Sequence, residues 1–219
     1  MKPLPLLMAM AALSLLPFAV LMATSFVRIS VVLSILRSAI GAPQVPPTSV
    51  LTGLALVLTV AVMAPTAGRM WQAAGPALEK SSGDLASPDT LAALTTAGAR
   101  AREPLREFLL AHTSPRERAS FHALALRMRT PAERASVTDR DLAVVVPAFV
   151  TSELRRGFEI GFLLFVPFLV LDLVIANLLL ALGMHMLSPT TVSLPFKLLL
   201  FVLADGWNLV VRGLMESYL

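Results

Sequence analysis

Two long stretches without a charged residue dominate the first third of this chain. No residue between Lys2 and Arg28 is charged, and none between Arg37 and Arg69. A helix that crosses a lipid bilayer needs roughly 20 mostly apolar residues. Each stretch is long enough for one such helix, so the sequence predicts two membrane-spanning helices here.

The first apolar stretch also has to be distinguished from a cleaved signal peptide. Lys2 provides only a weak basic start, and no A-x-A-like site closes the apolar run near Ala23. A secretory signal peptide usually combines a basic start with such a site. We therefore expect this segment to be retained as a helix.

Two further segments near the C-terminus are apolar enough to be candidate spans. Residues 160–182 contain one charge and residues 194–215 contain three, which makes the last segment the weakest candidate. Hydrophobic residues make up 56% of the chain and charged residues 15%, whereas soluble domains carry about 25% charged residues. A soluble fold of 219 residues cannot bury so much apolar surface. We expect an all-α membrane protein built of helical hairpins.

A polar module separates the two hydrophobic parts. Residues 69–141 hold eleven of the 18 basic residues and nine of the 14 acidic ones. This segregation predicts a hydrophobic helical hairpin in residues 1–67, an inserted small helical module in 68–141 and a second hydrophobic hairpin in 142–219. Each hairpin has a helix-breaking turn, because proline cannot continue a helix interior. The two turns lie at Pro43–Pro47 and Gly183–Pro189.

Three helix starts in the polar module place a hydroxyl at the N-cap and a proline at the first helical position. They are Ser87-Pro88, Ser114-Pro115 and Thr130-Pro131. Ser114 and Thr130 are also followed by glutamate at the spacing of a capping box. Apolar residues then recur at helical spacing, which predicts one stripe buried in the core of the module. The stripe consists of Phe121, Leu124, Ala125 and Met128.

The sequence contains no recognisable catalytic or cofactor-binding constellation. It has no cysteine, and His112, His122 and His185 lack the spacing of a metal site. Phosphate-binding, dinucleotide-binding and G-x-S-x-G motifs are missing too. The arginines are scattered among acids, which disfavours a nucleic-acid partner. We expect no enzymatic activity, no cofactor and no bound metal.

Charged residues inside the predicted spans carry more information. Such groups are costly in a bilayer unless they are paired or hydrated. Asp172 and Lys197 lie at nearly equal distances from the Gly183–Pro189 turn, so an antiparallel hairpin would bring them to the same depth. We expect a structural ion pair; the alternative is an ion-coupled site of a small multi-pass transporter. Gly157 and Gly161 have the spacing that lets membrane helices approach closely.

Short segments with a recognisable order recur throughout the chain. Before the polar module they are Thr24-Ser25-Phe26, Val31-Val32-Leu33, Leu36-Arg37, Val45-Pro46-Pro47 and Gly53-Leu54-Ala55-Leu56. The segment within the module is Pro104-Leu105-Arg106-Glu107-Phe108. After it come Val146-Pro147-Ala148-Phe149, Ser152-Glu153-Leu154, Gly161-Phe162, Pro167-Phe168-Leu169-Val170, Ala181-Leu182-Gly183-Met184, Ser193-Leu194-Pro195-Phe196-Lys197 and Asp205-Gly206-Trp207. In this order, the segments resemble the R-type subunits of bacterial type III secretion export gates, a family that includes flagellar FliP.

The resemblance implies a homopentamer that assembles with S-type and T-type membrane subunits. A U-type switch protein and a V-type export protein would join it on the cytoplasmic side, and unfolded secreted polypeptides would pass through its centre. It also implies a multi-pass protein in lipid contact in the bacterial inner membrane, with a periplasmic polar module. Arg28 and Arg37 would then form a cytoplasmic connection between the first two helices. Because flagellar members are longer and usually carry a cleaved signal peptide, the injectisome branch is favoured.

The resemblance also assigns a role to the turn between the last two hydrophobic helices. The family has a methionine triplet there that resembles a gasket in the pore, and this chain has Met184, His185 and Met186. Methionine is apolar and adaptable, so a ring of such side chains can close and still deform around a polypeptide. Without the resemblance, ordinary hairpin packing would be the better interpretation. His185 either points away from the axis or lines the pore.

Overall fold

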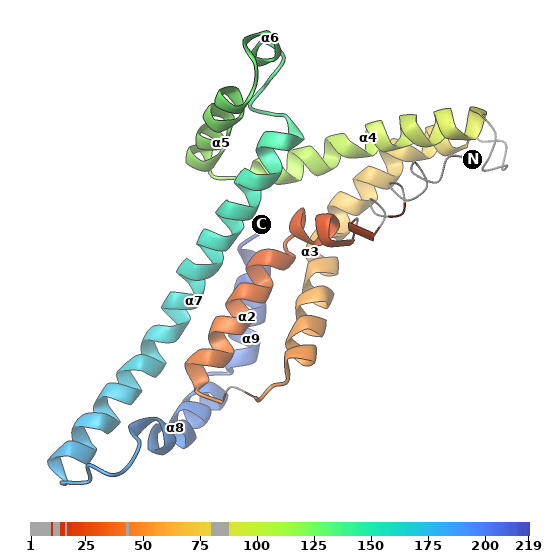
Figure 1. Ribbon diagram of the computed structural model, residues 1–219. Coiled ribbons are helices and arrows are strands. Elements are labelled where there is room, and N and C mark those ends of the chain that lie inside the picture. Colours follow the sequence, from red (N-terminus) through yellow and green to blue (C-terminus); the bar gives the residue numbers. More distant parts are fainter. Residues whose placement is uncertain (1–9, 11–13, 16, 43, 80–87) are drawn as a thin grey trace. The chain divides into compact units, whose positions relative to one another are not determined.

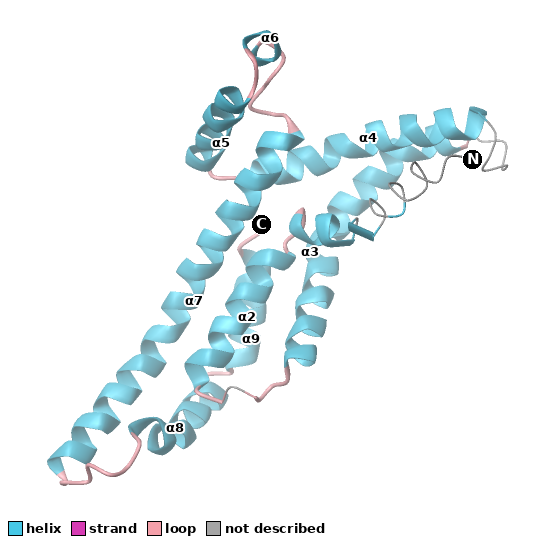
Figure 2. Cartoon of the chain, viewed as in Figure 1, coloured by secondary structure: helices cyan, strands magenta, loops and turns pink. Residues whose placement is uncertain are grey.

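The computed structural model describes residues 10, 14–15, 17–42, 44–79 and 88–219, and every regular element within these ranges is a helix (Figures 1 and 2). The all-α prediction is therefore confirmed. Of the predicted first helix, residues 17–22 are helical, whereas residues 1–9, 11–13 and 16 lie outside the described residues, as does the N-cap Ser87. The helices are α2 (Phe26–Ile40), α3 (Thr48–Leu78), α4 (Pro88–His112), α5 (Pro115–Met128), α6 (Pro131–Arg134), α7 (Leu142–Ala181), α8 (Pro189–Leu203) and α9 (Gly206–Glu216).

The chain forms two compact units, and α3 and α7 each contribute to both. One unit contains Met1–Ser25 and Val60–Glu153, and the other contains Phe26–Thr59 and Leu154–Leu219. We call the second the hairpin unit, because it contains the proline turn between α2 and α3 and the glycine turn between α7 and α8. Both turns lie where the sequence predicted them.

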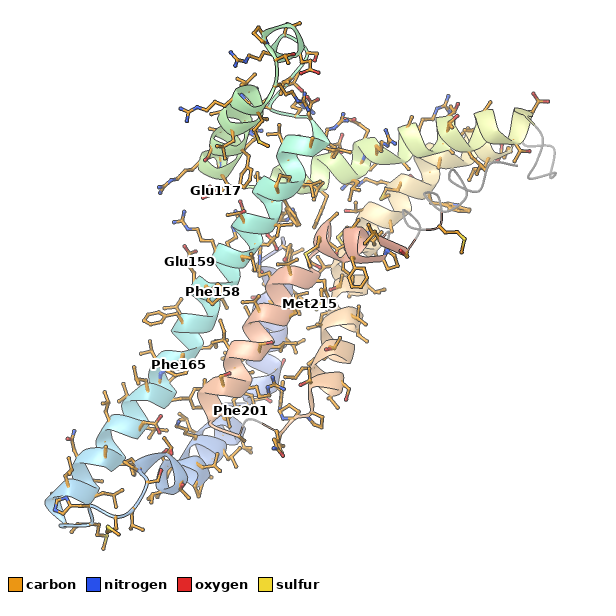
Figure 3. The ribbon with its side chains drawn as sticks, in the orientation of Figure 1. Glu117, Phe158, Glu159, Phe165, Phe201 and Met215 are labelled. Atoms are coloured by element: carbon orange, nitrogen blue, oxygen red, sulfur yellow. The ribbon has the colours of Figure 1, made fainter. Side chains whose placement is uncertain are left out.

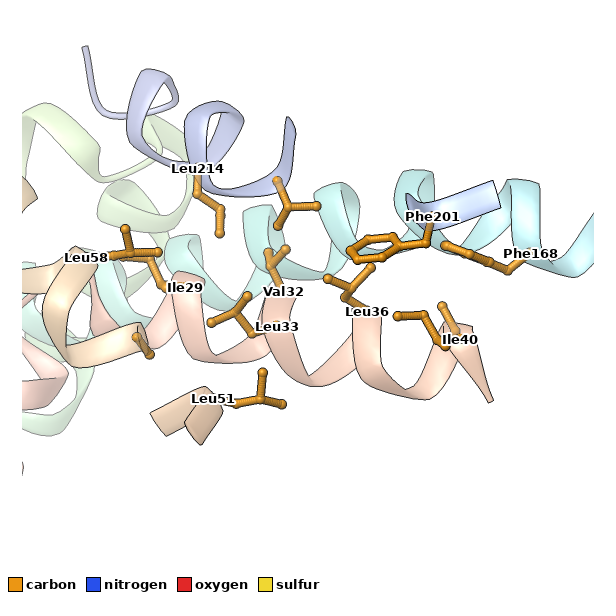
Figure 4. Packing of buried hydrophobic residues seen from close by; sticks show 13 residues of the cluster. Ile29, Val32, Leu33, Leu36, Ile40, Leu51, Leu58, Phe168, Phe201 and Leu214 are labelled. Carbon is orange, nitrogen blue, oxygen red and sulfur yellow. The ribbon is translucent and has the colours of Figure 1, made fainter. Parts of the chain in front are cut away.

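Helix α2 is the centre of the hairpin unit. Its buried face includes Ile29, Leu33 and Leu36, and it packs against residues of α3, α7, α8 and α9 (Figure 4). The other helices of the unit therefore share α2 as their common packing partner. Arg28 and Arg37 lie within this helix rather than in the predicted connection. That expectation was wrong because α2 begins at Phe26 and ends just before Gly41, whose φ of +83° suits a helix terminus.

Two helices of the described part are long and apolar enough to cross a membrane, α3 and α7. At 1.5 Å per residue the 40-residue α7 is about 60 Å long, twice the roughly 30 Å hydrocarbon layer. The predicted last span is broken, because α8 and α9 meet at an angle of 61°. The described residues thus contain two candidate spans, α3 and α7, or three if the bent pair of α8 and α9 counts as one.

The other unit contains the C-terminal part of α3, helices α4, α5 and α6, and the first turns of α7. The ring of Phe108 on α4 lies 5.9 Å from that of Phe149 on α7, and the backbone N–H of Ser114 donates to Ser152 Oγ over 3.0 Å. The capping box predicted at Thr130 is present, since Glu133 accepts hydrogen bonds from the Thr130 hydroxyl and N–H. These bonds lower the pKa of Glu133.

Two predictions for this unit were wrong. Ser114 precedes α5 as expected, but its side chain makes no capping bond. The predicted core stripe is also not buried: α5 has no buried residue, and Met128 is 86% exposed. Periodicity identifies an apolar face of a helix but not the surface that covers it.

Candidate functional site

A charge cluster joins three helices of the hairpin unit. The Lys197 ammonium on α8 lies 2.6 Å from Asp172 Oδ2 on α7, and it also donates to the backbone carbonyl of Ala39 on α2 over 3.3 Å. Ser193 Oγ, one turn before Lys197, donates to Asp172 Oδ1 over 2.5 Å. Lys197 is only 3% exposed, whereas Asp172 is partly exposed. The structure thus brings together the two charges that the sequence singled out.

Sequence reasoning missed the third partner, the C-terminal end of α2. The last carbonyls of a helix lack intrahelical partners and carry the negative end of the helix dipole. Ala39 lies one residue before the end of α2, so its carbonyl attracts the Lys197 ammonium. Gly41 follows with a φ of +83°, a conformation that favours glycine and ends α2 at this point. The glycine after a run of apolar residues was the signal that could have located this helix end.

Gly157 and Gly161 lie on the face of α7 that contacts α2. A Cβ on Gly161 would lie 2.4 Å from Ile35 Cδ1, and one on Gly157 would lie 3.1 Å from Val31 Cγ1. Phe158, the residue after Gly157, points away from α2 (Figure 3). The two glycines therefore set how closely α7 and α2 approach, and this packing is within one chain.

We expect Gly161→Ala to destabilise the hairpin unit. The added methyl group has to displace Ile35, and overpacking of this kind costs about 1–3 kcal/mol. Gly53→Ala on α3 is the matched control, since nothing lies within 4 Å of its Cβ position and alanine favours a helix. Thermal unfolding of the detergent-solubilised proteins measures the difference. Equal midpoints for the two variants would show that α7 and α2 do not need this glycine.

The methionine turn, Met184 to Met186, lies between α7 and α8. Gly183 has a φ of +71°, its N–H donates to Leu180, and the N–H of Met184 donates to Leu179. This is a Schellman motif, which ends α7 and fixes the direction of the following residues. Met186 is 98% exposed, and Met184 and His185 are exposed too. The turn is thus well defined in its backbone, while the Met186 side chain is almost uncovered by the described chain.

A second buried cation, Arg28, was not identified as a site residue from the sequence. It is 1% exposed, and its Nη1 donates to the Ser217 carbonyl over 3.1 Å and to Ser217 Oγ over 2.9 Å. Its guanidinium lies 3.9 Å from the centre of the Tyr218 ring, a cation–π geometry. Arg28 therefore fastens the segment after α9 to α2. The residues next to Arg28 in the sequence are mostly apolar, so they do not indicate that its partners are Ser217 and Tyr218.

The described residues contain no group of three or more His, Asp or Glu side chains placed to hold a metal ion. His112 Nδ1 contacts the Phe108 carbonyl at 2.8 Å, as a structural histidine within one helix does. His122 Nε2 lies 3.5 Å from the Val137 carbonyl. These two histidines make structural contacts. The candidate functional residues are the buried Asp172–Lys197 pair and the exposed methionine turn, both in the hairpin unit.

A family model described as the FliP family matches residues 9–214. The chain belongs to the FliP family. It is 44% identical over 213 residues to the hypersensitivity response secretion protein HrcR of Ralstonia nicotianae, covering 97% of this chain and 96% of the relative. It is also 44% identical over 214 residues to the Yop proteins translocation protein R of Yersinia pestis, covering 97% and 95%. The resemblance to R-type export subunits is confirmed.

Flagellar members of the FliP family match as well. The flagellar biosynthetic protein FliP of Caulobacter vibrioides is 48% identical over 210 residues, which cover 95% of this chain but 74% of that protein. The identities to the injectisome and flagellar relatives are similar, so identity does not separate the two branches. This FliP-family chain is a component of the type III secretion export apparatus, and its apolar helices make it a membrane protein.

Proposed function

We propose that this chain is the ring-forming channel subunit of the export gate, through which unfolded polypeptides cross the bacterial inner membrane. The observation that carries the proposal is the methionine turn. Its backbone is fixed by the Schellman motif at Gly183, while Met186 is 98% exposed. An apolar side chain held out in this way contributes little to the fold of its own chain and is available to other molecules.

A ring of these turns would make an apolar constriction. Methionine side chains are unbranched and can repack around an irregular chain, which suits a seal that has to open for different polypeptides. An apolar constriction also blocks ions by losing its water. We propose Met184 and Met186 as the seal, with His185 beside them in the same turn.

The charge cluster supports a structural role better than the alternative of an ion-coupled transporter. Lys197 contacts Asp172 Oδ2 and the carbonyl at the end of α2, and the Ser193 hydroxyl donates a hydrogen bond to the other carboxylate oxygen of Asp172. A transport site has to exchange its ion with water, whereas Lys197 is nearly inaccessible and its contacts are made by the fold itself. We propose that the cluster fixes the α7–α8 hairpin to α2 so that the turn is presented correctly.

We further propose the surroundings of this subunit. The polar module of residues 68–141 would be periplasmic, and the chain would form a homopentamer with S-type and T-type subunits. U-type and V-type proteins would join on the cytoplasmic side. The apolar side chains exposed along α7 support either lipid or subunit contact, because so many cannot face water.

Native mass spectrometry of the detergent-solubilised protein, co-expressed with the S-type and T-type subunits, tests the proposal. We expect a complex whose mass contains five copies of this chain, because exposed apolar helices are covered in such a ring. A transporter would give a monomer or dimer without the partners. A spectrum with only those small species would contradict the ring.

A further inference from the structure

Helix α9 has an exposed polar stripe within a segment that is otherwise apolar. Asn208, Arg212 and Glu216 repeat every fourth residue, so they share one face of the helix. All three are exposed, and so is Asp205, which precedes the helix. Asn208 Nδ2 donates to Asp205 Oδ2 over 2.9 Å, and Arg212 Nε lies 2.7 Å from Glu216 Oε1. We call these four residues the α9 polar stripe.

The opposite face of α9 is the one that packs. Gly206, Val210 and Leu214 are buried, and Val210 and Leu214 belong to the cluster around α2 (Figure 4). Gly206 is needed there because a Cβ would lie 2.3 Å from the Phe201 ring. The orientation of α9 is thus fixed by its apolar face, and the polar stripe has to point away from the hairpin unit.

Lipid is an unsuitable neighbour for this stripe. Arginine and carboxylate side chains are costly in the hydrocarbon layer, and an ion pair between exposed neighbours on one helix offsets little of that cost. The exposed residues in the last turns of the preceding α8 are apolar, among them Leu199, Val202 and Leu203, whereas α9 exposes charged residues beside apolar ones such as Leu209. Within α8 and α9, exposed charged side chains therefore begin at the 61° bend between the two helices.

A shallow, open depression of about 480 Å³ lies on the exposed face of α9, and all four stripe residues line it together with Ala204, Leu209 and Gly213. We propose that the α9 polar stripe lines the water-filled part of the export path, where a polypeptide in transit passes it. This inference rests on the proposed channel function. Mixed charges suit that place, since a wall with acids, an arginine and an amide stays hydrated and does not hold chains of one charge sign.

Cysteine labelling of the assembled gate tests the inference, because the chain has no cysteine of its own. Single cysteines replace Asn208 and Arg212 in the stripe, and Val202 on α8 as the apolar control. Arg127 in the polar module is a water-exposed control outside the path. Each variant is first checked for secretion and then treated with a membrane-impermeant thiol reagent. Labelling is repeated with an exported polypeptide stalled in the gate by fusion to a tightly folded domain.

We expect Asn208→Cys and Arg212→Cys to be labelled in the empty gate and to lose most of that labelling when the polypeptide is stalled. Val202→Cys should stay unlabelled, and Arg127→Cys should be labelled in both states. Labelling of the stripe that is unaffected by the stalled chain would overturn the inference, because the stripe would then face water outside the path. No labelling at either position would overturn it too, because the stripe would be covered by protein. Secretion identifies the variants that still assemble a working gate, and crosslinking of the stalled polypeptide at position 186 tests the channel function separately.

Discussion

Replacing Asp172 by asparagine should abolish assembly of the gate. Lys197 would keep its buried charge and lose the only carboxylate that contacts it among the described residues. Removing one partner of a buried ion pair typically costs about 3–5 kcal/mol, because the remaining charge is left uncompensated. That is a large part of the roughly 5–15 kcal/mol that stabilises a typical domain. The yield of assembled complex on a native gel measures the effect.

Two further variants separate a buried pair from a general sensitivity of α7. Glu159→Gln removes an acid from an exposed pair with Arg155 on the same helix and should leave assembly almost unchanged. The double variant Asp172→Leu, Lys197→Met removes both charges and should restore much of the yield. A charge swap should restore less, since an aspartate at position 197 would face the carbonyl end of α2. Normal assembly of Asp172→Asn would show that the pair is dispensable.

The double variant Met184→Ala, Met186→Ala should assemble normally and leak small ions. Both side chains are exposed in the subunit, so their truncation removes little packing within the chain. It would widen an apolar constriction, and a wider constriction retains water and conducts. Single-channel recording of the purified gate in a planar bilayer measures the leak.

Met128→Ala is the matched control for that variant. Met128 is exposed to a similar degree, but it lies on α5 in the polar module and not in the turn. It should leave the closed gate as tight as the unmodified protein. If the double variant were equally tight, the seal would have to lie elsewhere.

The sequence predicted the helical class, the two turns and the family, because these depend on local composition and on motifs in order along the chain. It also predicted the pairing of Asp172 with Lys197 from their positions about the turn, and the structure brings them together. The carbonyl of Ala39 could not be predicted in the same way. Its contribution depends on where α2 ends in space relative to α8. Ala39 and Lys197, which make this contact, are 158 positions apart in sequence.

The errors have physical causes as well. The stripe on α5 was interpreted as core because its spacing is helical, yet Leu124 and Met128 are exposed. Arg28 was placed in a connection on the basis of the topology that the resemblance implied, whereas it lies within α2 and its guanidinium contacts Ser217 and Tyr218. Long-range partners of this kind have no local signature in the sequence.

Site-specific crosslinking at Met186 tests the proposed channel most directly. A photoreactive amino acid at position 186 should crosslink to an exported polypeptide that is stalled in the gate. The same amino acid in place of Phe158, which is exposed on α7, should not crosslink to it. Efficient crosslinking at 186 alone is the result that this account predicts. Absence of a crosslink at 186, or equal crosslinking at 158, would contradict the claim that the methionine turn surrounds the export path.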